Sequence, residues 1–298
     1  MRRHVTNPSA LLLISALAAL LVAPASFAAP PLEGWHEDLT QAAKEAQEKN
    51  GKILVDLYAD WCGWCKVLEE KVFTTEAFKN FVEKENIVLL RVDTEDGAEG
   101  SQIQARYQAM SLPTTLILDQ DLVKVGAVTG YAPTEAFIRY LDEQLQAWQI
   151  LLANYPLVLE EGEPDLQRDV ARDFHQRGDG KKAAALYDKV LERVQEGTSA
   201  AAWVHYLSAD AHRLGGDLER ARSRLALTKK LAAQLTDETE LQEKADLLGY
   251  YIAQDAGDCK EAVGSLEAFL VAHPKSFLNR ELKRTLKSLK DSGDPACA

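Results

Sequence analysis

The sequence predicts an α/β domain followed by an all-helical domain. Between Lys52 and about Leu145, short apolar runs alternate with segments of helical periodicity. After about Asp165 the apolar runs stop, and a glycine-aspartate motif recurs between helix-periodic segments. The length of 298 residues accommodates about two domains of ordinary size. We therefore expect a layered α/β domain and a separate domain of helical hairpins.

The first 28 residues have the pattern of a secretory signal peptide. Two arginines precede an apolar run over residues 10–22, and small residues follow it. We place cleavage after Ala28, with Ala25 as the alternative. The apolar core of about 13 residues is shorter than the ~20 residues of a membrane-spanning helix, which argues against a retained anchor. We expect a soluble exported protein of the periplasm.

Charge and cysteine content narrow the function further. The chain has 34 Lys and Arg residues against 46 Asp and Glu residues, a formal net charge of -12. Such a surface repels nucleic acid and anionic lipid, so we expect no nucleic-acid partner and no stable membrane insertion. All four cysteines follow the leader, and an even number in an oxidising compartment favours disulfides.

Three apolar segments in the first domain have the features of strands. They are rich in β-branched residues and bounded by turn residues. They are KILVDLY at 52–58, NIVLLRVD at 86–93 and TTLILD at 114–119. Cys65, Leu68 and Val72 share one helical face after the first segment, and residues 137–141 form another helical pattern. Pro113 marks the start of the third strand or a special turn, since proline is excluded from a central ladder.

Cys62 and Cys65 lie between the first strand and a helical pattern. A c-type haem site requires a histidine after the second cysteine, where this chain has Lys66. A structural zinc site requires four ligands, and no second pair stands at matching spacing, so we expect no metal. A purely structural staple is the remaining alternative, but closing so short a loop removes little entropy from the unfolded chain. A redox-active disulfide is therefore the favoured interpretation.

The position of each group predicts its role. A helix N-terminus stabilises a thiolate, which makes Cys62 the attacking sulfur. Cys65, one turn inside the helix, would resolve the mixed disulfide. Asp56 interrupts an otherwise apolar strand, where burial would raise its pKa and suit it to accept a proton from Cys65. The alternative is that Asp56 faces solvent on an edge strand.

The second domain contains an internal repeat of the form G-D-x-x-x-A. The copies lie at 178–183, 216–221 and 257–262, so the repeat recurs after 38 and then 41 residues. We expect glycine to end one helix, aspartate to cap the next, and the small alanine to let paired helices approach. A plain helical bundle is the alternative. With two prolines and an acidic turn before the repeats, we place a linker at 151–165, between domains at 29–150 and 166–298.

Cys259 lies in the third repeat and Cys297 is one residue from the C-terminus. A disulfide between them would close 38 residues and contribute ~4 kcal/mol in the chain-entropy model. A second redox site is the alternative, but neither cysteine has a C-x-x-C partner. We expect a structural disulfide.

Together, the stretches ILVDLYADWCGWCK, SLPTTLILD and VTGY resemble the thioredoxin superfamily. The phrases ADWC-x-x-CK-x-x-E-x-x-VF and VTGY are closer still to the C-terminal periplasmic domain of the transmembrane thiol:disulfide interchange reductases and their soluble relatives. The resemblance covers about residues 32–145. The helical half resembles tetratricopeptide-type repeats, although its spacing exceeds their usual period of about 34 residues.

The resemblance implies the same three roles for Cys62, Cys65 and Asp56. It also implies a cis bond between Leu112 and Pro113, with the Leu112 backbone pairing with an extended substrate strand. The residues that it places against substrate are Trp61, which would cover the sulfurs, Gly63, Trp64 and Leu112.

Two departures from the family pattern concern redox and proton chemistry. Trp64 replaces the proline common between thioredoxin cysteines, so the redox potential does not transfer. The lysine that often lies near the buried aspartate is absent, with Leu89 in its place and Arg91 nearby.

The predicted function is an exported thiol-disulfide oxidoreductase that exchanges the Cys62-Cys65 pair with cysteines of client proteins, in the reducing direction. It needs no dissociable cofactor, only a redox partner that resets the pair. The alternative is a helical-repeat binding or scaffold protein whose first domain is not catalytic. In either case the repeats are expected to bind a peptide or protein.

Overall fold

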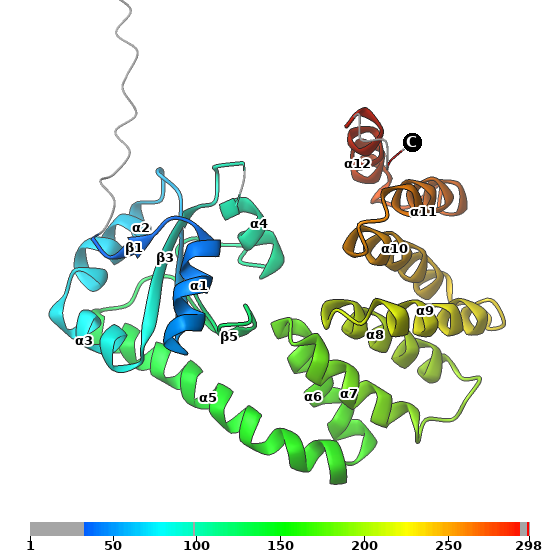
Figure 1. Cartoon of the computed structure of the whole chain (residues 1–298), viewed down its shortest axis with the longest axis horizontal. Helices are drawn as coiled ribbons and strands as arrows, with labels where there is room; N and C mark the ends of the chain where they lie inside the picture. The colour runs from blue at the N-terminus through cyan, green and yellow to red at the C-terminus, as the bar shows by residue number, and fades with distance from the viewer. Residues whose placement is uncertain (1–32, 98, 293–296, 298) are drawn as a thin grey trace, which may run out of the picture. The chain divides into compact units, whose positions relative to one another are not determined.

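The computed structural model describes residues 33–97, 99–292 and 297. The predicted signal peptide and both of its candidate cleavage positions lie outside these residues. Within them, an α/β domain precedes a purely helical region, as the sequence predicts (Figure 1). No helix in these ranges combines the length and apolar character needed to span a bilayer.

The α/β domain is built on one five-stranded sheet. Its strands are β1 (Trp35–His36), β2 (Lys52–Tyr58), β3 (Ile87–Asp93), β4 (Thr114–Leu118) and β5 (Lys124–Thr129). Their order across the sheet is β1-β3-β2-β4-β5. β1 and β2 each run parallel to β3, whereas β4 runs antiparallel to both β2 and β5. The three predicted strands are therefore confirmed at the centre of the sheet.

Helices cover both faces of this sheet (Figure 1). They are α1 (Leu39–Lys49), α2 (Gly63–Leu68), the π-helix η1 (Glu69–Phe73), α3 (Glu76–Lys84), α4 (Glu99–Arg106) and α5 (Thr134–Glu161). α2 and η1 follow each other without a break, so the segment after Cys62 is helical as far as Phe73.

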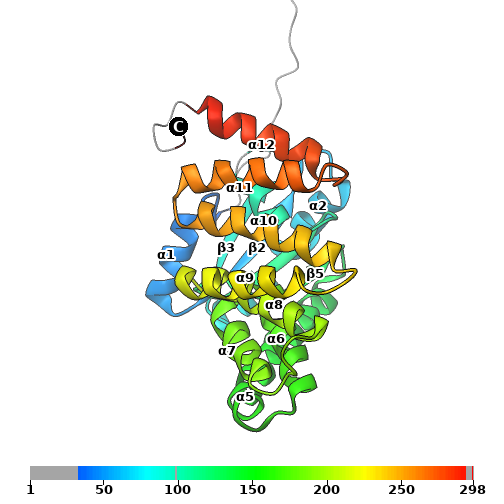
Figure 2. The ribbon, with the colours of Figure 1, turned by 90° about the vertical axis from the view of Figure 1, so that its right-hand side faces the viewer.

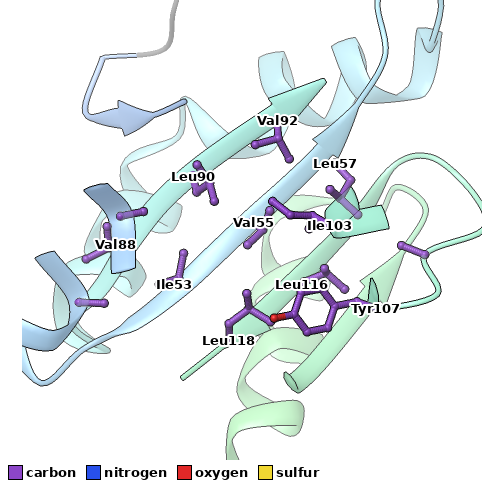
Figure 3. Packing of buried hydrophobic residues seen from close by; sticks show 13 residues of the cluster. Ile53, Val55, Leu57, Val88, Leu90, Val92, Ile103, Tyr107, Leu116 and Leu118 are labelled. Atoms are coloured by element: carbon purple, nitrogen blue, oxygen red, sulfur yellow. The ribbon is translucent and has the colours of Figure 1, made fainter. Parts of the chain in front are cut away.

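Alternate residues of the strands point to opposite faces. On the face covered by α1 and α4, the buried side chains form a continuous apolar cluster (Figure 3). Ile53, Val55 and Leu57 of β2 belong to this cluster. The residues between them, including Asp56, point to the other face, where Phe73 of η1 contacts the rings of α3 and α5.

The helical region consists of antiparallel pairs followed by a last helix (Figure 2). Its helices are α6 (Pro164–Arg177), α7 (Gly180–Leu191), α8 (Ser199–Leu214), α9 (Leu218–Ala232), α10 (Thr239–Asp255), α11 (Cys259–Ala272) and α12 (Asn279–Asp291). The three repeat motifs are the turns inside the pairs α6/α7, α8/α9 and α10/α11. Each helix packs chiefly against its neighbours in sequence.

Each repeat turn has the predicted geometry. Gly178, Gly216 and Gly257 adopt positive φ angles of 87°, 82° and 68°, which glycine tolerates without strain. The aspartate after each glycine accepts a hydrogen bond from a backbone N–H in the first turn of the next helix. The alanine of each motif is buried. The repeat is therefore a set of helical hairpins; its assignment to the tetratricopeptide type stays a prediction.

The segment expected as a linker has a different structure. α5 continues through most of residues 151–165 and ends at Glu161, with Pro156 inside the helix, and α6 begins at Pro164. Packing explains why this segment stays helical, because Tyr155 and Trp148 of α5 both contact the ring of Phe174 on α6. Tertiary contacts therefore outweigh the helix-breaking tendency of one proline.

Candidate active site

The Cys62-Cys65 pair forms a disulfide at the start of α2. The two Cα atoms are 5.3 Å apart. Cys62 is the N-cap of the helix, and the backbone N–H of Cys65 donates to its Sγ at 3.1 Å. Both cysteines are almost fully buried. The structure thus places the predicted attacking sulfur where backbone N–H groups stabilise negative charge.

The loop before β4 packs against this disulfide. The Leu112-Pro113 peptide bond is cis, as the resemblance implies. Leu112 is partly buried and packs against the cluster formed by Ala59 and the two cysteines. The N–H of Gly130 donates to the carbonyl of Pro113 at 2.8 Å, which links the VTGY stretch to this loop. Leu112 therefore packs against the disulfide, although it is far from Cys62 and Cys65 in sequence.

Exposed aromatic side chains flank the cysteines in sequence. Trp61 and Trp64 are 68% and 61% exposed, and the ring of Trp64 stacks on that of Tyr131, with centroids 5.7 Å apart. Gly63 begins α2 between them. The substrate-contacting roles of these residues, and the covering of the sulfurs by Trp61, stay predictions. Tyr131 was not singled out from the sequence, although it follows Gly130 in the VTGY stretch.

Asp56 lies at the middle of β2, between β3 and β4, and is only 1% exposed. The alternative of a solvent-facing edge position is therefore wrong. Burial raises the pKa of the Asp56 carboxyl to about 7, with Arg91 acting to lower it and Glu69 to raise it. A carboxyl with this pKa exchanges protons near neutral pH, which suits the predicted role as proton acceptor.

Arg91, expected near Asp56 from the sequence, lies beside it, and Glu69 joins the two as a group that the sequence did not indicate. Arg91 of β3 lies beside Asp56, with Nε 3.5 Å from Oδ2, and its terminal nitrogen is 2.7 Å from Glu69 Oε2. The guanidinium also lies over the ring of Tyr58, 4.0 Å from its centroid. Glu69 follows Cys65 by four residues on the same helix. The register of β2 and β3 sets Arg91 opposite Asp56, and the ion pair between Arg91 and Glu69 depends on how η1 packs against β3.

A second disulfide joins Cys259 and Cys297, with their Cα atoms 4.6 Å apart. The predicted pairing is therefore present. Cys259 is the first residue of α11, so the bond ties the end of the chain to the last helical hairpin.

Comparison with known proteins concerns the first domain. A thioredoxin-like family model matches residues 34–120. Two relatives are both named thiol:disulfide interchange protein DsbD. The protein from Haemophilus influenzae (strain PittGG) is 33% identical over 103 residues, covering 34% of this chain and 17% of the relative. The protein from Actinobacillus pleuropneumoniae is 32% identical over 111 residues, covering 35% and 19%. The chain thus spans less than a fifth of the length of either relative.

Two solved structures each align with 37% of the chain. The C-terminal domain of Neisseria meningitidis DsbD in the oxidised form aligns with a TM-score of 0.33 and 17% identity, over 37% of this chain and 98% of that domain. A thioredoxin from Thermus thermophilus aligns with a TM-score of 0.33 and 22% identity, over 37% and 84%. The match of the family model and the DsbD sequences identifies residues 34–120 as a thioredoxin-like domain.

Proposed function

We propose that this chain is a protein-disulfide oxidoreductase that exchanges its Cys62-Cys65 pair with cysteines of other proteins. The observation that carries the proposal is the Cys62-Cys65 disulfide itself, capping a helix and packed against Leu112 before cis Pro113. The similarity of this domain to DsbD proteins supports the same chemistry.

The exchange proceeds in two thiol-disulfide steps. In the reducing direction, the Cys62 thiolate attacks one sulfur of a client disulfide, and the other client sulfur leaves as a thiolate that takes up a proton. Cys65 then gives its proton to the Asp56 carboxylate and attacks the Cys62 sulfur. The Cys62-Cys65 bond forms, the bond to the client breaks, and the second client thiolate is protonated. Two electrons pass from the pair to the client. One of the two protons comes from Cys65 through Asp56, and the other comes from solvent, to which Cys62 gave its proton on forming the thiolate.

Trapping tests the exchange chemistry directly. A Cys65→Ser variant retains the attacking sulfur but cannot resolve the mixed disulfide, so we expect it to accumulate covalent complexes with client proteins that dithiothreitol releases. The Cys62→Ser variant is the matched control and should trap none. Absence of complexes with Cys65→Ser, under both oxidising and reducing conditions, contradicts the proposal.

The proposed direction is reduction of clients, with a separate dithiol partner that resets the pair. Resemblance to the interchange reductases supports this direction. Equilibration of the full chain with glutathione measures the potential of the pair. A value near the approximately −270 mV of thioredoxin supports a reductase, whereas a value near the approximately −120 mV of a strong oxidant contradicts the direction but not the exchange.

We also propose that the chain is exported to the periplasm and that cleavage follows Ala28. The leader pattern supports this, and a disulfide outside the C-x-x-C pair suits an oxidising compartment. Intact-mass measurement of the protein from a periplasmic extract tests it. A full-length mass in that extract would contradict the cleavage.

A second candidate function belongs to the helical region, which would bind a client or partner. The observation that favours it is a hollow of about 380 Å³ whose lining includes Tyr206, Tyr251 and Phe277. Phe277 is 88% exposed there. In the Cys65→Ser background, Phe277→Ala should lower client capture, while Val271→Ala, at an equally exposed position of α11, should not. Equal capture by both would contradict a binding role for this hollow.

A further inference from the structure

A buried arginine contacts two carboxylates, one on β2 and one on η1, the helical turn that continues α2 after Cys65. Arg91 is 9% exposed and reaches Asp56 on β2 and Glu69 on η1. Glu69 is one helical turn beyond Cys65, and its backbone N–H donates to the Cys65 carbonyl. The cluster therefore connects the proposed proton acceptor to the same helix that carries the resolving cysteine.

The two carboxylates contact Arg91 differently. The 2.7 Å separation from Glu69 is that of a charge-assisted hydrogen bond, whereas the 3.5 Å separation from Asp56 is an ion pair without one. Within the described part of the chain, no donor hydrogen-bonds to either oxygen of Asp56. Asp56 thus experiences the positive charge of Arg91 while its oxygens stay open to accept a proton.

The groups around Asp56 come from several elements. Arg91 on β3 and Glu69 on η1 are the charged groups that act on Asp56 among the described residues. Thr115 of β4 is the register partner of Asp56, and its buried hydroxyl has no hydrogen-bond partner within the described chain. On β2 itself, Tyr58 lies under the guanidinium. On this side of the sheet, α3 and α5 contribute the phenylalanine rings that contact Phe73, and these rings do not titrate.

We propose that Arg91 is a positioning residue that keeps Asp56 ionised and able to accept the Cys65 proton, and that Glu69 holds the guanidinium in place for this task. The inference deepens the proposed function and rests on it. In the resolving step, the proton moves from the Cys65 sulfur to an Asp56 oxygen, the Cys62-Cys65 bond forms and the Cys62-client bond breaks. The proton then passes to the departing client thiolate, so Asp56 returns to its charged form.

The two neighbours of Asp56 have opposite expected effects. Without the cation, as in Arg91→Gln, the carboxyl holds its proton to higher pH, so the rise of the resolution rate with pH moves upward by at least about one unit. In Glu69→Gln, the acceptor for Arg91 remains but the like charge is gone, so the rise moves downward. Arg91→Lys keeps the charge and should restore much of the profile.

Stopped-flow reaction of the full chain with dithiobis(nitrobenzoate), after reduction of Cys62-Cys65 with the Cys259-Cys297 bond left intact, separates the two steps. The first thionitrobenzoate is released by Cys62 attack and the second by Cys65 resolution, so the first phase is an internal control. The expected result is opposite displacement of the second-phase pH midpoint in Arg91→Gln and Glu69→Gln. Arg139→Gln, which removes an exposed charge on α5, should leave both phases unchanged.

Several outcomes would overturn the inference. If the wild type shows both phases but the midpoints of the Arg91 and Glu69 variants coincide with it, Arg91 is not a positioning residue while the proposed exchange survives. A loss of rate at every pH without movement of the midpoint means the same. If the reduced wild type releases no second thionitrobenzoate and forms no Cys62-Cys65 bond, the proposed function itself fails. Should Arg91→Gln not fold, Arg91→Lys and Glu69→Gln still decide the question.

Discussion

The chain contains two disulfides whose surroundings differ in almost every respect. Cys62 and Cys65 enclose only two residues and lie at a helix N-terminus. Their domain also contains the buried Asp56 carboxyl, which accepts no hydrogen bond from the residues that the structure describes. Cys259 and Cys297 are separated by 38 residues, and their bond secures the last helical hairpin. A short closed loop stabilises little, and a long one stabilises more. Sequence separation and local chemistry, rather than the bond itself, therefore distinguish the redox-active disulfide from the structural one.

Removal of one sulfur from each pair separates the two roles most strongly. Cys62→Ser should reduce exchange with a model disulfide such as insulin to the uncatalysed background. The remaining Cys65 lies inside α2 and not at its N-cap, where backbone N–H groups stabilise a thiolate. The double variant Cys259→Ser/Cys297→Ser should retain exchange within about twofold, since its bond lies in the helical region. Turbidity of reduced insulin measures both. A large loss of activity in the double variant would contradict a purely structural role for the Cys259-Cys297 bond.

Asp56 should lower the stability of the first domain at neutral pH. Its pKa is about 7 in the folded protein against an ordinary 3.8, so the folded state binds the proton more tightly. The stability associated with Asp56 is therefore fully present below about pH 4 and is lost as pH rises through about 7. Asp56→Asn should stabilise the oxidised protein at pH 8 by on the order of 4 kcal/mol at most, and by almost nothing at pH 4.

Urea unfolding at the two pH values measures this difference. Asp38→Asn, which changes an exposed aspartate that caps α1, is the matched control. Equal stabilisation of Asp56→Asn at pH 4 and pH 8 would mean that Asp56 is not a buried titrating group.

The Cys259-Cys297 disulfide should stabilise the fold and take no part in thiol-disulfide exchange. Loss of the Cys259-Cys297 bond is expected to cost between about 2 and 4 kcal/mol of unfolding free energy. Because reduction of Cys62-Cys65 opens only a two-residue loop, Cys62→Ser/Cys65→Ser should cost much less. Chemical unfolding of the two double variants, compared under oxidising conditions, measures the contrast. Similar costs would show that loop length does not separate the pairs.

The smallest expected effect concerns the repeat turns. Asp217→Ala removes a side chain that accepts from the N–H of Arg220 at the start of α9, so the free energy of unfolding should fall by about 1 kcal/mol. Exchange activity should not change, because the turn belongs to the helical region. Asp217→Asn preserves a good cap and should restore stability. A change in exchange rate with either variant would mean that the helical region affects the thiol-disulfide chemistry of the first domain.

Local signals in the sequence predicted the central strands, the Cys62-Cys65 pair and the capped turns, because each depends on a few adjacent residues. The Cys259-Cys297 pair, 38 residues apart, was predicted from the number of cysteines and not from a local pattern. β1 has only two residues, and β5 contains Gly126, so neither has a run of strand-forming side chains. The reason for that glycine is tertiary, since a Cβ there would lie 2.5 Å from the side chain of Gln144 on α5. The predicted linker differs for a similar reason, because contacts with α6 hold the end of α5 helical.

The candidate site divides along the same line. Cys62, Cys65 and Asp56 were recognisable from residue type and neighbours, and the structure places the first two together at a helix start and Asp56 in the core. The sequence placed Arg91 only near Asp56, because the two residues are opposite each other through the register of two strands 35 residues apart in sequence. The ion pair between Arg91 and Glu69 is a property of the folded chain.

The order of the helices gives the C-terminal staple a further consequence. In an array where each helix packs mainly on the next, melting can begin at a free end and propagate inward one hairpin at a time. The bond between Cys259 and Cys297 secures that end, so fraying from the C-terminal side must first work against a covalent tie. In a reducing environment this disulfide opens, and unfolding of the helical array can then begin at its last hairpin.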